Sequence, residues 1–244
     1  MPYRIHRYSI SCSLSFRIRP FFNMIMQTDR IILRRWHEKD AAILYKYASD
    51  PDVGPRAGWP AHKSVEESRE VINRYFSNDA TWAIVLKHIG EPVGCIGFYT
   101  HQQSNIPIGE EDCEVGYWVA KPYWNQGICT EALRLMIAYC IHVRRFSTIY
   151  ADYFTGNPAS GRVMEKCGFR DTGRLNRCSH LLGGDRDMVR VMVYTKEQSD
   201  DNNSFLRTIH KIHSIMRRLF LCSLISAVST YYTMYNLWRK PEVQ

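Results

Sequence analysis

The segment that most constrains the fold runs from Cys113 to Val143, where a strand pattern gives way to a helix pattern within a few residues. Residues 113–119 are rich in β-branched and aromatic side chains, which favours a strand. After Gly127 apolar residues recur at helical spacing, which favours a helix. The first N–H groups of such a helix lack partners within the helix and carry positive potential, so they can bind phosphate. A glycine at this kind of junction can equally serve packing alone.

The flanking sequence predicts an α+β domain. Strand patterns occupy residues 31–33, 81–87, 92–99, 148–154 and 187–195, and helical patterns occupy residues 38–48, 64–76 and 157–167. Ser64 and Glu67 have the spacing of a capping box, Asn157 stands where the last helix begins, and Gly168 stands where it ends. Hairpin-like strands come first and a strand–helix–strand unit follows, so we expect a mixed sheet.

We expect three parts: a basic, unstructured extension at 1–27, a folded domain at 28–198, and a linker with a basic, apolar helix at 199–244. The extension carries +4, residues 205–244 carry +5, and the whole chain carries +8, which leaves −1 for residues 28–204. A near-neutral domain lacks the positive surface that binds phosphate backbones, so we expect no nucleic-acid binding by the core. The extension resembles a targeting segment in composition but has no long apolar stretch. We prefer the interpretation that translation begins at Met24 or Met26, which leaves the earlier residues absent or unstructured.

The C-terminal residues 217–240 are the part that would attach the protein to a membrane. Residues 219–238 are mostly apolar or aromatic and lie between basic pairs, at close to the length that crosses a bilayer. Several hydroxyl side chains dilute this character, so a membrane helix, a helix docked on the domain and a disordered tail all remain open. The expected localisation is cytoplasmic, with weak membrane association through this segment.

The eight cysteines form no Cys-x-x-Cys pair and stand beside no histidine cluster. Metal sites built from cysteine need such spacing, so we expect no metal. Buried thiols in a reducing compartment are the preferred interpretation.

Two ordered motifs indicate a family. The segment Glu114 to Leu133, followed by Asn157 to Phe169, resembles the pyrophosphate-binding motif and the next helix motif of the GNAT superfamily of N-acetyltransferases. The similarity is strongest to the ribosomal-protein alanine N-acetyltransferases of this superfamily. Two further segments, Thr28 to Arg34 and Gly94 to Phe98, also resemble that branch. The resemblance extends from Thr28 to about Gln198.

The resemblance implies a mostly antiparallel sheet that is flanked by helices and splayed beside residues 114–119, with acetyl-CoA as co-substrate in the gap. The implied acetyl-CoA contacts are the main chain of Trp118 and Val119, the N–H groups of Gln126, Gly127, Ile128, Cys129 and Thr130, and the side chain of Asn157. Trp124 and Cys129 depart from the family pattern, which usually has Gln or Arg at the first position and Gly or Ala at the second.

Acetyl transfer to an amine needs a neutral amine, a stabilised oxyanion and a proton for the leaving thiolate. Glu114 shares a strand face with Gly116, so we take it as the candidate base; the alternative is an ordinary charge paired with an arginine. The family's proton-donating tyrosine position is Met164 here. Ser160 is therefore the candidate acid, and its alternative is an ordinary first-turn serine.

We expect an N-acetyltransferase that moves an acetyl group from acetyl-CoA to a primary amine by direct attack in a ternary complex. A protein N-terminal α-amine is the preferred acceptor, because its pKa of about 8 makes deprotonation easy. The alternatives are a small-molecule amine as acceptor, a non-catalytic acyl-CoA-binding sensor, and a membrane-associated interaction protein. We expect a monomer or a homodimer.

Overall fold

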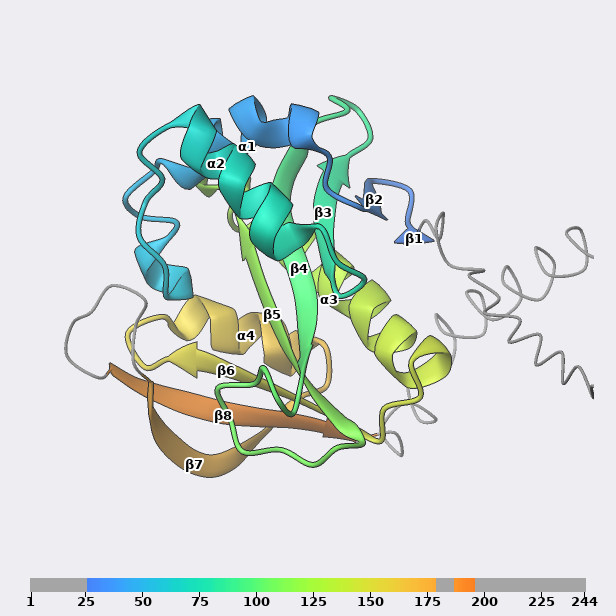
Figure 1. Ribbon diagram of the computed structural model, residues 1–244. Coiled ribbons are helices and arrows are strands. Elements are labelled where there is room, and N and C mark those ends of the chain that lie inside the picture. The colour runs from blue at the N-terminus through green and yellow to red at the C-terminus, as the bar shows by residue number, and fades with distance from the viewer. Residues whose placement is uncertain (1–25, 179–186, 196–244) are drawn as a thin grey trace, which may run out of the picture.

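The computed structural model describes residues 26–178 and 187–195, which form one sheet with helices on both faces (Figure 1). The strands are β1 (Met26–Gln27), β2 (Ile31–Arg34), β3 (Thr81–Leu86), β4 (Pro92–Thr100), β5 (Asp112–Val119), β6 (Thr148–Phe154), β7 (Arg170–Cys178) and β8 (Asp187–Thr195). Their order in the sheet is β1-β2-β3-β4-β5-β6-β8-β7. Every neighbouring pair is antiparallel except β5 with β6, which confirms the predicted mostly antiparallel sheet.

The helices divide between the two faces. They are α1 (Ala41–Ala48), which follows the short turn Glu38–Asp40, α2 (Val65–Val71), which continues into Ile72–Phe76, α3 (Ile128–Ala138), which continues into Tyr139–Val143, and α4 (Pro158–Lys166). Short helical turns at Pro55–Ala57 and Lys121–Tyr123 complete the described helical residues. Ser64 caps α2 as predicted, by accepting the Glu67 N–H at 3.0 Å, whereas the Glu67 carboxylate accepts from the Lys63 N–H rather than from Ser64.

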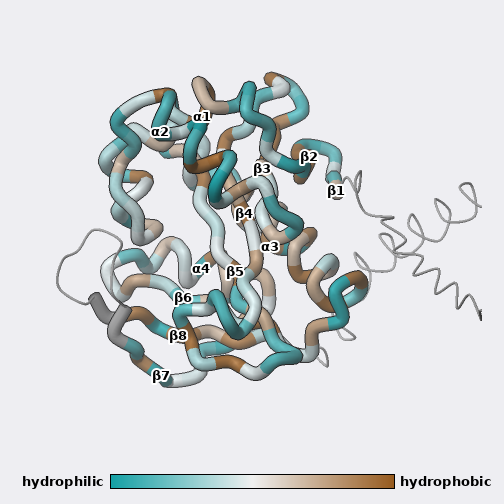
Figure 2. Tube along the Cα trace, in the orientation of Figure 1, coloured by the Kyte–Doolittle hydropathy of each residue, from teal (hydrophilic) through white to brown (hydrophobic). Residues whose placement is uncertain are grey.

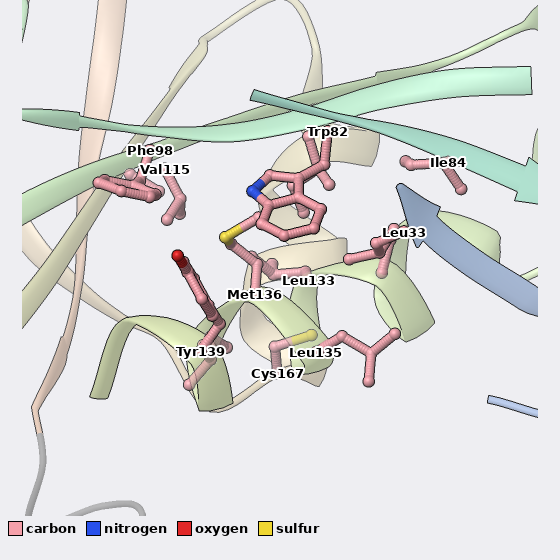
Figure 3. Packing of buried hydrophobic residues seen from close by; sticks show 14 of the residues in the cluster. Leu33, Trp82, Ile84, Phe98, Val115, Leu133, Leu135, Met136, Tyr139 and Cys167 are labelled. Atoms are coloured by element: carbon pink, nitrogen blue, oxygen red, sulfur yellow. The ribbon is translucent and has the colours of Figure 1, made fainter. Parts of the chain in front are cut away.

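The main core lies between the sheet and α3. Figure 3 shows Leu133, Met136 and Tyr139 of this helix pointing toward Trp82 and other strand residues. The Tyr139 and Trp82 rings meet edge to face at 5.5 Å between centroids. Each such buried side chain contributes about 1.5–3 kcal/mol relative to an exposed one. This burial anchors α3, and with it the turn that precedes the helix.

A smaller core lies on the opposite face, between α1, α2 and the sheet. Its buried members include Trp36, Leu44, Ile72 and Cys95. Figure 2 shows that the outer turns of α2 are largely hydrophilic. The buried cysteines Cys95, Cys113, Cys140 and Cys167 are free thiols, in agreement with the sequence prediction.

The sheet opens between β5 and β6. These strands pair in parallel only where Asp112, Cys113 and Glu114 face Thr148, Ile149 and Tyr150. Beyond that point β5 continues beside β4 to Val119, and β6 continues beside β8 to Phe154. The two strands therefore diverge (Figure 1), and the splay that the family resemblance implies is present.

Two strands were not expected. β1 pairs with β2 and begins two residues before the predicted domain start at Thr28. The sequence of β7, RDTGRLNRC, has no apolar alternation, so the strand patterns in the sequence did not include it. Because β7 pairs with β8 alone, it lies at an edge of the sheet, where polar side chains reach water.

The predictions for residues 1–25 and 196–244 fall outside the described residues. Within 26–178 and 187–195, no helix combines the length and the apolar character that crossing a membrane requires.

Candidate active site

The turn before α3 presents unpaired N–H groups at the mouth of the gap. Asn125 and Gly127 have left-handed φ values of 60° and 78°, and this backbone conformation suits glycine best. The first intrahelical bond runs from the Glu131 N–H to the Gly127 carbonyl at 3.0 Å. The N–H groups of Ile128, Cys129 and Thr130 consequently have no main-chain acceptor among the described residues. The turn can hold a phosphate group.

Arg30 brings a positive charge to the same turn. Its Nη1 donates to the Gln126 carbonyl at 3.1 Å, and its guanidinium forms an ion pair with Glu131 in the first turn of α3. The Thr28 hydroxyl donates to the same carboxylate. These contacts offset a negative charge that would repel phosphate. Sequence reasoning used Thr28 and Arg30 only as part of the resemblance, because nothing in the linear sequence connects them with a helix about 100 residues later.

The two departures from the family pattern fit the turn. The Trp124 indole N–H donates to the Val119 carbonyl at 2.7 Å, which ties the turn to the end of β5. The Arg56 guanidinium lies 5.5 Å from the centre of the Trp124 ring. Burial raises the pKa of the Cys129 thiol to about 12. This thiol therefore stays neutral at physiological pH and adds no negative charge beside the phosphate site.

The register of β4 and β5 decides which main-chain groups face the gap. The Ala120 N–H donates to the Val93 carbonyl of β4 at 2.8 Å. Because successive residues alternate, the main-chain groups of Trp118 also point toward β4, whereas those of Tyr117 and Val119 point toward β6. Trp118 and Val119 were the two residues expected to pair with acetyl-CoA. The main-chain groups of Trp118 face β4, so of the two only Val119 faces the gap. Val119 offers its N–H there, because the Trp124 indole occupies its carbonyl. The register was not readable from one sequence.

Glu114 lies at the last paired position before the gap and is buried, with an exposed fraction of 3%. Its carboxylate accepts the Ser104 hydroxyl at 2.6 Å and the Asn105 N–H at 2.9 Å. It therefore holds the connection between β4 and β5, and its partners are not the arginine that we considered. Burial raises the pKa of Glu114, and the hydrogen bonds from Ser104, Asn105 and Ile106 oppose that rise.

Ser160 lies on the other side of the sheet. Its hydroxyl donates to the Tyr117 hydroxyl at 3.2 Å, and the Tyr117 hydroxyl donates to the Ser160 carbonyl at 2.9 Å. Met164, which stands at the family's tyrosine position on α4, is buried in the main core. The phenol beside Ser160 is instead that of Tyr117, which belongs to β5. Glu114 and Ser160, predicted as a pair, lie on opposite faces of β5 and can meet only through the gap.

The segment between α1 and α2 covers the open end of β5. The Trp59 and Trp118 rings meet edge to face at 5.5 Å between centroids. The Asn157 amide nitrogen donates to the Arg56 carbonyl at 3.3 Å, so this side chain links α4 to the same segment. Among the described residues, no three His, Cys, Asp or Glu side chains are grouped as metal ligands would be. The opening between β5 and β6 and the turn before α3 together form a place where a phosphate-bearing ligand can be held, with its phosphate at the turn and the rest of the ligand in the opening.

Comparison with known proteins identifies the family. Residues 30–170 match the acetyltransferase (GNAT) domain, so the chain belongs to the GNAT acetyltransferase family and is an N-acetyltransferase. YoaA of Bacillus subtilis (strain 168), an uncharacterized N-acetyltransferase, is 27% identical over 65% of this chain and 90% of that protein. The [ribosomal protein uS5]-alanine N-acetyltransferase of Escherichia coli (strain K12) is 24% identical over 70% of this chain and 91% of its own.

Solved structures have the same fold. A GNAT-family acetyltransferase from Bacillus anthracis superposes with a TM-score of 0.63 at 25% identity, over 71% of this chain and 99% of that one. The structure of AAC(6')-Ib in complex with ribostamycin and coenzyme A superposes with a TM-score of 0.57 at 17% identity, over 72% and 99% of the two chains.

Proposed function

We propose that the protein transfers the acetyl group of acetyl-CoA to a primary amine, preferably the α-amine of a protein N-terminus. The observation that carries this proposal is the set of open N–H groups at the start of α3, at the mouth of the gap that opens between β5 and β6 beyond Glu114. Two relatives support the two halves of the proposal. One is named for acetylating a ribosomal-protein alanine, and the other was solved in complex with ribostamycin and coenzyme A.

The pyrophosphate of acetyl-CoA would bind the N–H groups of residues 126–130, with Arg30 adding positive charge. A backbone site of this kind tolerates Trp124 and Cys129, because its donors are peptide groups. The pantetheine arm would enter the gap and pair with the free main-chain edge of β5. There the N–H groups of Tyr117 and Val119 can donate to its amide or to the acetyl carbonyl, where negative charge develops during attack.

Ser160 is the residue that we propose for proton delivery to the departing thiolate. Its hydroxyl donates to the Tyr117 hydroxyl at 3.2 Å, which fixes its position; delivery to sulfur requires this hydroxyl to turn toward the gap, and a proton of the attacking amine replaces the one it gives. Burial raises the pKa of Tyr117, which keeps this phenol protonated at neutral pH. Asn157 would orient the pantetheine arm through its amide oxygen, because its nitrogen is engaged with Arg56.

Incubating the full chain with acetyl-CoA and defined acceptors tests the proposal. The acceptors are peptides that begin with alanine, serine or methionine, matched peptides with a blocked N-terminus and a free lysine, and ribostamycin. Mass spectrometry of each acceptor avoids thiol reagents, which would also react with the protein's own cysteines. We expect acetylation of at least one free-N-terminal peptide and none of the blocked ones. Acetylation of ribostamycin alone would replace the protein acceptor with a small molecule.

Binding is measured in parallel by calorimetry with coenzyme A. Binding without turnover of any acceptor would favour a sensor over an enzyme of this specificity. Absence of binding would contradict the proposed use of acetyl-CoA.

A further inference from the structure

A second carboxylate lies at the gap, on the strand opposite Glu114. Asp152 is two residues beyond Tyr150, the last β6 residue that pairs with β5. Glu114 and Tyr150 are register partners, and side chains alternate along a strand, so Asp152 lies on the same sheet face as Glu114 and Gly116. It therefore borders the opening from the β6 side, at the level where β5 no longer covers the strand.

The two carboxylates differ in their partners. Glu114 accepts hydrogen bonds from Ser104 and Asn105, which fix it to the connection between β4 and β5. No described residue donates a hydrogen bond to Asp152, although it is partly buried. A partly buried carboxylate that borders an opening, with no hydrogen-bond donor among the described residues, is a candidate for a group that a substrate or a reaction uses.

The surroundings of Asp152 raise the pKa of its carboxyl to near neutral pH. Burial, and then the negative charge of Glu114, raise the pKa of Asp152 to about 7. Among the described residues, Tyr99 and Cys95 of β4 and Tyr150 of β6 are further titratable groups on this sheet face, and the Tyr99 ring lies 3.4 Å from the position of a β-carbon on Gly116. Burial, and then the neighbouring acidic groups of Cys95, Glu114 and Asp152, raise the pKa of Tyr99 to about 12, so it stays a neutral phenol. On β8 the register partner of Asp152 is the buried, apolar Val191.

We propose that Asp152 is the catalytic base that takes the proton from the attacking amine, with Glu114 as its positioning neighbour. This inference rests on the proposed acetyl transfer and names a residue on which sequence reasoning was silent. A base that is half protonated near neutral pH is well matched to this task. Glu114, by contrast, would have to break two hydrogen bonds to reach the acceptor.

Each proton of the acceptor amine can be followed through the proposed acetyl transfer. An ammonium acceptor enters with three hydrogens on nitrogen. One proton moves to the Asp152 carboxylate, and the freed lone pair forms the N–C bond to the acetyl carbonyl carbon. The C–S bond then breaks, with its electron pair leaving on sulfur. The second proton ends on the thiolate by way of Ser160, the third stays on the amide, and Asp152 returns its proton to solvent.

The test is the pH profile of kcat/KM for an acceptor peptide, measured on the full chain as wild type, Asp152→Asn, Glu114→Gln and Asp79→Asn. Asp79 is an exposed aspartate far from the gap in sequence and serves as the matched control. The wild-type rate should rise through one ionisation at about pH 7, that of Asp152, and should not rise further as the peptide amine deprotonates at about pH 8, because the acceptor enters as the ammonium. Asp152→Asn should lose this ionisation and about 100-fold or more in kcat, with acetyl-CoA affinity kept within about twofold. Asp79→Asn should match wild type.

Glu114→Gln provides an independent readout if Asp152→Asn fails to fold. Removing the Glu114 charge lowers the Asp152 pKa, so the Asp152 ionisation should move to lower pH. A wild-type-like rate and profile for Asp152→Asn, or an unmoved ionisation in Glu114→Gln, would overturn this assignment alone. Failure of the wild type to acetylate any acceptor would instead overturn the proposed function.

Discussion

Replacing Asp152 with asparagine should stabilise the protein at alkaline pH although it impairs the reaction. The pKa of this carboxyl rises from 3.8 to about 7 in the fold. One pKa unit corresponds to about 1.4 kcal/mol, so ionised Asp152 costs the folded state about 4 kcal/mol above pH 7. The cost is absent below the unfolded pKa and grows as pH rises toward the folded one. Asparagine removes this charge but buries an amide that itself costs about 1–3 kcal/mol.

The expected net gain for Asp152→Asn is therefore about 1–3 kcal/mol at about pH 8, and it should vanish or reverse at about pH 4. Urea denaturation followed by circular dichroism, on wild type, Asp152→Asn and Asp79→Asn, measures the difference at both pH values. The same free-energy difference at both, or a variant less stable than wild type at about pH 8, would refute the argument, because a group without a raised pKa produces no such pH dependence.

Four further variants probe how the fold builds the site. Gly127→Ala should lose about 1 kcal/mol of stability, because alanine disfavours the φ of 78°, and it should bind coenzyme A more weakly in calorimetry. Gly173→Ala has a similar φ of 73° far from the gap, and should lose stability without losing affinity. Gly161→Ala would place a β-carbon 2.6 Å from the Tyr153 ring, so either this ring or α4 must move. We expect a loss of about 1–3 kcal/mol in thermal melts together with a lower kcat. An unchanged kcat would show that turnover does not depend on the packing of α4 beside Ser160. Arg30→Ala should raise the Kd for coenzyme A more at low than at high salt, and equal effects at both would contradict a phosphate role for this charge.

Much of the fold was predictable from local patterns. The strands at 148–154 and 187–195 have the predicted bounds, and the helix after Gly127 is anchored by the apolar face that its spacing indicated. Strand β7 escaped prediction because a polar edge strand has no apolar alternation. The splay was implied only by the family resemblance, since periodicity within one strand carries no information about its neighbours.

The site was predictable only in part, for the same reason. The turn at 126–130 is local in sequence, and sequence reasoning located it. The Arg30–Glu131 pair, the Tyr117–Ser160 contact and the position of Asp152 depend on which strands lie side by side and in what register. Glu114 was singled out for its position beside a glycine, whereas its hydrogen bonds to a distant connection could not be read from the sequence.

A crystal structure of the full chain with coenzyme A tests the central claim most directly. We expect the pyrophosphate within hydrogen-bond distance of the N–H groups of residues 126–130, and the thiol in the gap between β5 and β6, on a line toward Asp152. Coenzyme A bound elsewhere, or a thiol that ends away from this gap, would contradict the account.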